Sequence, residues 1–393
     1  MNFSKPQTLL DQHLRKAGLM WTSVLDISSW EQFWEVQATP AELQTDFNFY
    51  ERWLSEGGHA NMTYLQNNLA ARKDARKILA GVKCIISLII PYAEGHSVRG
   101  SGQKNETQSD AIIAKIARYA RVPDYHRSLK REIDTVLHAW QKDALSQNLL
   151  SQTTSWRVVT DSLPFLDRAH ARLAGLGFVG KNTMLIRPGV GSFFFIAHAL
   201  IDAPFEILAA ENLEKPLAAN AIAELSCGEC RKCLDACPTG ALIAPMYLQS
   251  DKCLSYLTIE SRAQIPSEFI PHLGAQFYGC DICQDVCPYN LRTTPLQTIK
   301  SFEKQHDFFL QITLEQVAKM SQAEYEKWFG GTAMTRAKYS GLVRNALCAL
   351  YATRNAALSD ILLQRRNDAE PLIAATAHQL MELNGRQHVP DPQ

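Results

Sequence analysis

Residues 227–238 read CGECRKCLDACP, so four cysteines fall within eleven positions and a proline follows at once. Their spacing is C-x2-C-x2-C-x3-C-P, and residues 280–288 repeat its second half as C-x2-C-x3-C-P. Cys253 lies between the two runs. Cysteines at these spacings are typical of [4Fe–4S] binding, with four thiolates for each cluster. Eight thiolates therefore predict two [4Fe–4S] clusters in this part of the chain.

The fourth cysteine of such a run ligates the other cluster in two-cluster ferredoxins. The spacing therefore predicts one cluster on Cys227, Cys230, Cys233 and Cys287, and a second on Cys237, Cys253, Cys280 and Cys283. Zinc is the alternative, because it also binds C-x2-C pairs, usually as two separated knuckles. Three cysteines at x2 spacing fit zinc poorly. The two remaining cysteines lie in apolar segments and are predicted core residues, Cys84 and Cys348.

The composition is that of a soluble, packed protein without a strong charge. The chain has 393 residues, 40 of them basic and 40 acidic, and a pI near 7.1. Net charge therefore gives no sign of a nucleic-acid or membrane partner, and any such contact must use a local patch. The first residues hold no apolar signal-peptide core, and no apolar run is long enough to span a bilayer. A cytoplasmic protein of about two to three domains is expected, in which clustered cysteines indicate redox or metal chemistry.

Residue patterns predict strands and helices in alternation. Apolar, β-branched runs predict strands at 82–90, 156–160 and 191–201, and helical periodicity predicts helices at 110–121 and 125–148. Other segments are predicted as mainly helical (1–80 and from about 305), as a polar loop (94–108), or as a linker or short helix (209–224). Strands that alternate with helices predict an α/β layer. The whole chain is expected to be α+β and multidomain.

Residues 160–186 read TDSLPFLDRAHARLAGLGFVGKNTMLI. They predict a helix with Asp161 or Ser162 as its cap and a glycine-rich turn, 175–180, at its end. These glycines allow a flat or anionic ligand to approach the backbone, or they serve only the helix–strand turn. The stretch is not a dinucleotide-binding fingerprint, because the glycines follow the helix instead of opening it.

Several stretches together resemble the epoxyqueuosine reductase family. They are Asp161-Ser162, ARYARVPDYH (117–126), GLGFVGKN (175–182), GSFFF (191–195), CGECRKCLDACPTGA (227–241), CLSYLTIE (253–260), YGCDICQDVCPYN (278–290) and GLVRN (341–345). The resemblance implies reduction of epoxyqueuosine to queuosine at the wobble position of tRNAs with GUN anticodons (those for Asp, Asn, His and Tyr). This is the last step of queuosine biosynthesis. It also implies a cobalamin cofactor beside the two [4Fe–4S] clusters.

The same resemblance implies the domain organisation. It divides the chain into a cobalamin-binding α/β domain related to that of reductive dehalogenases (1–224), a ferredoxin-like module for two [4Fe–4S] clusters (225–295) and a C-terminal helical, HEAT-like repeat domain (296–393). Two departures from the family pattern stand out. The segment between Gly191 and Cys227 is longer, and Ala117 occupies a position where some relatives carry a cysteine.

Site residues follow from the resemblance position by position. It implies that Asp161 is the acid that protonates the departing epoxide oxygen, whereas the residues alone equally allow a helix cap. It implies cobalamin contacts at Arg72, with Arg76 as the close alternative, and at Lys181 and Asn182. Arg72 and Arg76 are alternatively solvated helix residues, and the other two alternatively serve only their turn.

Binding of tRNA must rely on a local basic surface, and its affinity should fall with salt. Candidates in GGTAMTRAKYSGLVRN are Arg336, Lys338 and Arg344, helped by Arg292, and each is alternatively part of a solvated helix face. The target base must turn into a pocket to be reached. A flavodoxin or ferredoxin is the expected electron donor, and a monomer without membrane contact is the expected state.

Two other functional classes stay open at this point. A reductive-dehalogenase-like reductase of a small molecule would share cobalamin and clusters, but such enzymes typically carry a twin-arginine export signal. A non-catalytic electron-transfer protein or cobalamin carrier would need neither an acid at Asp161 nor a large C-terminal region. The family resemblance favours the tRNA-modifying enzyme over both.

Overall fold

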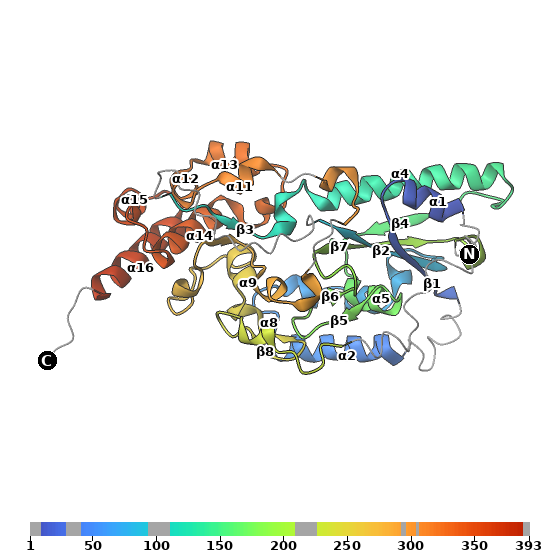
Figure 1. The fold of residues 1–393 in the computed structure, drawn as a ribbon, viewed down its shortest axis with the longest axis horizontal. Helices are drawn as coiled ribbons and strands as arrows, with labels where there is room; N and C mark the ends of the chain where they lie inside the picture. Colours follow the sequence, from blue (N-terminus) through green and yellow to red (C-terminus); the bar gives the residue numbers. More distant parts are fainter. Residues whose placement is uncertain are drawn as a thin grey trace.

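The computed structural model describes residues 9–28, 41–92, 111–208, 226–291, 296–303 and 306–387. The predicted loop at 94–108 and the predicted linker at 209–224 lie outside these residues. The molecule is elongated, with a β-sheet at one end and a group of helices at the other (Figure 1). The cysteine-rich region lies between them.

A four-stranded sheet organises the first of these regions. Its order is β1-β2-β7-β4, and every pairing in it is antiparallel. The strands are β1 (Trp21–Asp26), β2 (Cys84–Pro91), β7 (Phe194–Ile201) and β4 (Trp156–Val159). The three predicted strands are therefore confirmed, whereas β1 lies in a region that was predicted to be mainly helical. The predicted α/β layer is thus present, and all of its strand pairs are antiparallel.

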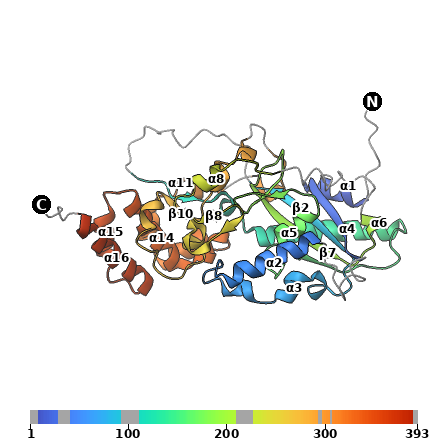
Figure 2. The ribbon, with the colours of Figure 1, turned by 90° about the horizontal axis from the view of Figure 1, so that it is seen from below.

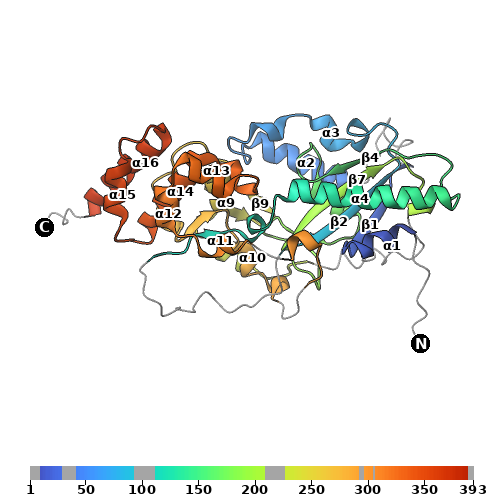
Figure 3. The ribbon, with the colours of Figure 1, turned by 90° about the horizontal axis from the view of Figure 1, so that it is seen from above.

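Helices cover both faces of the sheet. They are α1 (Leu9–Lys16) and α4 (Tyr125–Ser146) on one side, and α5 (Asp167–Leu173) with α2 (Ala41–Ser55) on the other (Figures 1 and 3). In β2, Ile86 and Leu88 pack on the α1–α4 side, while Ile85 and Ile89 pack on the opposite side. Burial on both faces explains why β2 is apolar, apart from Ser87, instead of alternating.

The predicted helix at 110–121 is wrong over its described part. A short strand, β3 (Lys115–Ile116), pairs in parallel with β10 (Gln276–Tyr278), and the 3-10 helix η4 (Arg118–Arg121) follows it. Pairing with a strand far away in the sequence overrides the local periodicity. The predicted helix at 125–148 is confirmed as α4.

Short elements carry the cysteine-rich region, which Figure 2 shows between the sheet and the C-terminal helices. They are α8 (Lys232–Asp235), β8 (Leu242–Ala244), β9 (Tyr247–Leu248), α9 (Leu254–Ile259) and α10 (Ile282–Asp285). Two further strands, β5 (Phe178–Val179) and β6 (Leu185–Ile186), form a hairpin beside them. Few residues here have regular backbone pairing.

The C-terminal region is helical, as predicted. Its helices are α11 (Asp307–Gln311), α12 (Leu314–Lys319), α13 (Gln322–Phe329), α14 (Lys338–Ala352), α15 (Leu358–Arg365) and α16 (Pro371–Gln387). Thr313 and Ser321 begin α12 and α13 with capping boxes. The central helix, α14, is buried along most of its length. None of the helices in the described ranges is both long and apolar enough to cross a membrane.

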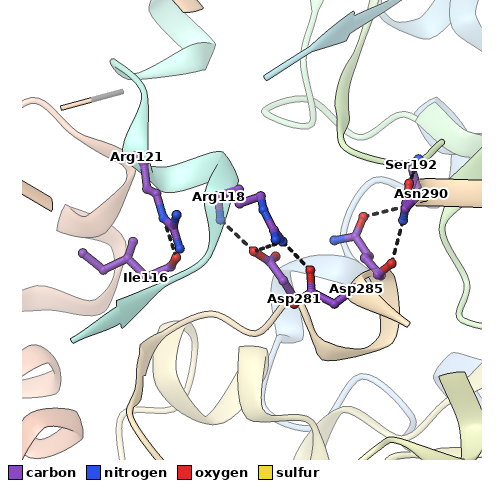
Figure 4. Close-up of polar contacts among 8 residues, drawn as sticks. Ile116, Arg118, Arg121, Ser192, Asp281, Asp285 and Asn290 are labelled. Atoms are coloured by element: carbon purple, nitrogen blue, oxygen red, sulfur yellow. Dashed lines mark hydrogen bonds and ion pairs between the residues drawn. The ribbon is translucent and has the colours of Figure 1, made fainter. Parts of the chain in front are cut away.

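Arg118 joins η4 to the cysteine-rich region. Its backbone N–H and its guanidinium both bind Asp281 Oδ2, at 2.9 and 3.3 Å, and the guanidinium also binds Asp285 Oδ1 at 2.6 Å. Figure 4 shows Arg118 reaching from η4 to these two carboxylates, one just before and one within α10. The segment that leads into α4 is thereby fixed to the second cysteine run.

Candidate active site

A large cavity opens beside the sheet, and its volume is about 1960 Å³. Its walls come from α2, α5, the segment 161–166 and the glycine-rich turn, and from residues 226–228 of the cysteine-rich region. Apolar atoms make up most of the lining. Typical sites for small ligands measure about 300–1,000 Å³, so this cavity has room for a much larger molecule.

Asp161 lies in the wall of this cavity with its side chain about half exposed. Its carboxylate accepts a hydrogen bond from the Tyr125 hydroxyl at 2.5 Å and faces His126 Nε2 at 2.8 Å. The predicted capping role is wrong, because α5 begins only at Asp167 and its N-cap residue is Leu166. Asp161 therefore presents its carboxylate to the cavity and to two partners from α4.

Asp124 and His126 complete this group. The Asp124 carboxylate caps α4 by accepting from the His126 backbone N–H at 3.1 Å, and it also contacts His126 Nδ1 at 2.9 Å. The imidazole thus bridges Asp124 and Asp161. Burial lowers the pKa of His126, but hydrogen bonds and charge interactions with Asp161 and Asp124 outweigh it, and the net pKa is raised. The protonated, donating form of His126 therefore persists to higher pH than it would in a free histidine.

Sequence reasoning did not find a role for Tyr125 and His126. They meet Asp161 because β4 runs back along α4, as the hydrogen bond from Trp156 Nε1 to Asp134 shows. The start of the helix therefore lies beside the end of the strand. The sequence feature that could have indicated this role is an Asp cap followed by two polar aromatic residues at the start of a long helix.

A second carboxylate, Asp167, also lines the cavity. Burial, followed by repulsion from Asp161, raises the pKa of Asp167 to about 7. Its Oδ1 atom is buried without a hydrogen-bond partner among the described residues. The charged group recorded nearest to this oxygen is His198 Nε2 on β7, at 3.9 Å, so the oxygen faces the sheet.

Nε of Arg72, in α3 (Leu69–Lys73), is also buried without a hydrogen-bond partner among the described residues. Arg72 is buried in the cavity wall, where its guanidinium lies over the Tyr50 ring at 5.6 Å and Nη2 donates to the Tyr64 carbonyl at 3.4 Å. The alternative residue, Arg76, pairs with Asp74 and is not among the cavity-lining residues. The geometry thus favours Arg72 as the ligand contact.

The glycine-rich turn packs against its own hairpin. A Cβ atom at Gly177 would lie 2.4 Å from the Ile186 carbonyl oxygen, and one at Gly180 would lie 2.4 Å from Ile186 Cδ1. These two glycines therefore serve the β5–β6 turn, which was the simpler of the two interpretations. Lys181 lines the large cavity, whereas Asn182 is buried beside the cysteines and donates to the Cys283 carbonyl at 3.3 Å.

The cysteines gather in two groups. Cys227, Cys230, Cys233 and Cys287 line a smaller cavity of about 260 Å³, so the last cysteine of the second run joins the first three of the first run. Burial, then repulsion from Cys253 and Cys237 among other groups, raises the pKa of Cys280 to about 12, which places these three thiols near one another. Cys283 lies close to Cys280 and Cys253. Ligation of individual clusters by these groups stays a prediction.

The four thiols around the smaller cavity leave space between them. Within the described ranges, no group of three or more His, Cys, Asp or Glu side chains is positioned to hold a single metal ion. Four thiols spread around a cavity of about 260 Å³ instead leave room for a cluster. Cys227 and Ser226 also line the large cavity, so one wall separates the two spaces.

The three predicted tRNA contacts differ in how far the structure exposes them. Arg344 is fully buried in α14, and its guanidinium donates to the carbonyls of Leu257, Ser261 and Ala263, so the prediction that it contacts tRNA is wrong. Its sequence neighbours gave no sign of this burial, because the carbonyls belong to a segment some 80 residues away. The other two are exposed: Lys338, and Arg336, which pairs with Glu260. Arg292 lies outside the described residues.

Comparisons with known proteins give consistent results. A family model described as epoxyqueuosine reductase QueG, DUF1730, matches residues 72–162, and one described as a 4Fe-4S double cluster binding domain matches residues 226–290. An epoxyqueuosine reductase from Leadbetterella byssophila is 35% identical over 75% of this chain and 86% of that protein. One from Pseudomonas aeruginosa is 30% identical over 81% of each.

Solved structures share the fold. A crystal structure of epoxyqueuosine reductase with a tRNA-Tyr epoxyqueuosine-modified stem loop matches with a TM-score of 0.73 and 22% identity, over 97% of this chain and 94% of that one. A structure of epoxyqueuosine reductase from Streptococcus thermophilus matches with a TM-score of 0.71 and 21% identity, over 98% and 94%. The arrangement of sheet, cysteine-rich region and C-terminal helices is therefore that of these enzymes.

Proposed function

This chain belongs to the epoxyqueuosine reductase family, and we propose that it reduces epoxyqueuosine in tRNA with a cobalamin in the large cavity and Asp161 as proton donor. Reduction of the epoxide to an alkene consumes two electrons and two protons and releases the oxygen as water. The observation that carries the proposal is the Asp161 carboxylate on a cavity that shares its Cys227 wall with the cysteine group.

The residues around the large cavity fit a cobalamin. The volume suits a macrocycle, the lining is largely apolar, and Arg72, in the wall, has a buried Nε without a hydrogen-bond partner among the described residues. Arg72, Tyr50 and Lys181 are the side chains that would hold it. When bound, cobalamin supplies a strongly reducing, nucleophilic cobalt centre. The chain's own part is to orient the substrate, exclude water and deliver protons.

Two [4Fe–4S] clusters on the eight cysteines supply single electrons. One cysteine group borders the large cavity through Cys227; its members are Cys227, Cys230, Cys233 and Cys287. This position supports the cluster on that group as the one that would pass electrons to the reaction site. The group of Cys237, Cys253, Cys280 and Cys283 would receive electrons first. A flavodoxin or ferredoxin is the class of donor that such clusters accept.

Proton delivery falls to the Asp161 group. In its protonated form, Asp161 donates from its carboxyl oxygen to the oxygen that leaves the epoxide carbon. The Tyr125 hydroxyl orients this carboxyl group, and His126, whose pKa is raised, can return a proton to it. Asp124 holds the imidazole in place from the other side. These residues therefore form a short relay from α4 to the cavity.

The substrate is a tRNA whose modified base enters the cavity. One solved relative carries an epoxyqueuosine-modified tRNA stem loop, which supports this partner. Lys338 and Arg336 are the proposed phosphate contacts, since both are exposed, Lys338 as the first residue of α14 and Arg336 in the 3-10 helix η9 (Ala333–Ala337) before it. We also propose domain limits of 1–224, 225–295 and 296–393, a HEAT-like arrangement of the last domain, and a cytoplasmic monomer.

The function is tested under anaerobic conditions. The protein is reconstituted with iron and sulfide, with or without cobalamin, given a low-potential reductant and incubated with epoxyqueuosine-bearing tRNA. Mass analysis of the nucleosides should show loss of one oxygen only when cobalamin is present, and an Arg72→Met variant should bind cobalamin more weakly by absorbance titration. If the protein binds its clusters and cobalamin fully but forms no product, the proposed function is wrong. A reductase of a small molecule, or an electron carrier, would then be the better interpretation.

A further inference from the structure

Lys181 lies between the two cavities of the site. Its backbone N–H donates to Cys227 Sγ at 3.4 Å, and its ammonium group donates to the Gly228 carbonyl oxygen at 2.6 Å. Its own carbonyl accepts from the Met246 backbone N–H at 2.9 Å. Because Lys181 also lines the large cavity, it forms part of the wall that separates that cavity from the cysteine group.

No carboxylate of the described residues forms an ion pair with the Lys181 ammonium group. Among the ion pairs of the described residues none involves Lys181, whereas Lys83 pairs with Asp202 and Lys130 pairs with Asp134. The ammonium group contacts a neutral carbonyl instead. A positive charge is therefore fixed beside Cys227, which belongs to the group of four thiols nearest the large cavity.

Reduction of a [4Fe–4S] cluster adds one electron and hence one negative charge. A nearby positive charge and an N–H···S hydrogen bond both stabilise this more negative state, so both raise the reduction potential. Solvent screens part of the effect, since the Lys181 side chain is partly exposed. The direction of the effect does not depend on the degree of screening.

We propose that Lys181 raises the reduction potential of the cluster on Cys227, Cys230, Cys233 and Cys287, and so draws the electron to the cluster that borders the large cavity. In this step the second cluster is oxidised by one electron and the first is reduced by one electron. The proposal rests on the proposed cluster positions, but not on the tRNA substrate. It gives the lysine of the GKN turn an electrostatic role toward the cluster in addition to its place in the cavity wall.

Three variants separate charge from tethering. Lys181→Arg keeps the charge and a donor for the Gly228 carbonyl. Lys181→Gln keeps a donor but removes the charge, and Lys181→Met removes both. All three retain the backbone N–H that reaches Cys227. If the side chain only tethers the Gly228 segment, Lys181→Gln should behave like the wild type.

The measurement is a redox titration of the full-length protein with both clusters, followed by electron paramagnetic resonance and carried out without tRNA. Each cluster gives one reduction wave in this titration. The wave that is lost in a Cys287→Ser variant is assigned to the first cluster, the one that includes Cys227 and Cys287. We expect Lys181→Gln and Lys181→Met to shift this wave to lower potential, Lys181→Arg to leave it in place, and the wave of the second cluster to stay unchanged in all three.

Lys142→Gln serves as a matched control, because Lys142 is an exposed lysine on α4. It should move neither wave. An unchanged first wave in Lys181→Gln, or an equal shift of both waves, would overturn the proposal. The titration reads potentials alone, so failure to reduce epoxyqueuosine would count against the proposed function without deciding this point.

Discussion

At Asp161 the backbone φ is +44°, in the left-handed region that residues other than glycine rarely adopt. Such strain persists where the surroundings hold a residue in place, and it gathers at functional sites. Here Tyr125 and His126 hold the carboxylate from one side. The strain supports a role for Asp161 beyond that of a connecting residue.

The ion pairs of His126 should make stability depend on pH. A histidine whose pKa is raised on folding contributes stability that is fully present below its unfolded pKa and is lost as pH rises through its native pKa. The melting temperature of the wild type should therefore fall more steeply than that of His126→Gln as pH rises above about 6.5, the unfolded pKa of histidine. Thermal unfolding followed by circular dichroism measures this, and parallel curves for the two proteins would count against it.

Arg344 should be needed for stability and not for tRNA contact. Its guanidinium satisfies carbonyls of Leu257, Ser261 and Ala263 in the protein interior. Hydrogen bonds to charged groups contribute about 1.5–3 kcal/mol each, so Arg344→Met should lower the free energy of unfolding by about 3 kcal/mol or more. Urea denaturation tests this. A variant that keeps its stability but binds tRNA more weakly would restore the original prediction.

At the scale of elements, patterns in the sequence predicted β2, β7, β4 and α4 correctly, because each carries its own signal. β2 is a continuous apolar strand between helices, and α4 has an apolar stripe with an Asp cap. The helix predicted at 110–121 was wrong over its described part, because the conformation there depends on pairing between β3 and β10. Local periodicity does not reveal such pairing. α5 begins six residues later than Asp161 because the intervening segment lines the cavity.

The link between η4 and α10 carries the next prediction. Arg118→Met would leave Asp281 buried without its cation, and breaking such a partly buried pair should cost about 2 kcal/mol in the free energy of unfolding. Arg127→Met is the matched control, because Arg127 is 86% exposed and its pair with Asp124 spans 3.7 Å. Its effect should stay below about 0.5 kcal/mol. Equal effects of the two variants in urea denaturation would contradict this account of the link.

At the scale of the whole molecule, the cysteine spacing predicted which thiols the structure brings together around the smaller cavity. The spacing has this power because ligands of one cluster must converge wherever the chain runs. Basic residues carry no such constraint. Arg336, Lys338 and Arg344 lie within nine positions of one another, yet one is buried, one is paired and one is exposed. Surface roles of this kind depend on tertiary packing, which the sequence pattern did not reveal.

Two regions of the molecule meet at the large cavity, where Asp161 and the glycine-rich turn lie in one part of the wall and Cys227 lies in another. The central claim is that Asp161 protonates the oxygen that leaves the epoxide. It predicts that Asp161→Asn loses activity although the carboxamide keeps the size of the side chain. The claim makes no demand on the binding of iron, sulfide, cobalamin or tRNA by the variant.

The most direct measurement is a single anaerobic incubation of wild type and Asp161→Asn with epoxyqueuosine-bearing tRNA, at equal cluster and cobalamin loading. Mass analysis of the digested tRNA then counts the queuosine formed. We predict full conversion by the wild type and at least a hundredfold slower conversion by the variant, in line with the usual contribution of a positioned acid, about 10²–10⁴-fold. Equal conversion by both proteins would contradict the claim and return Asp161 to a structural role.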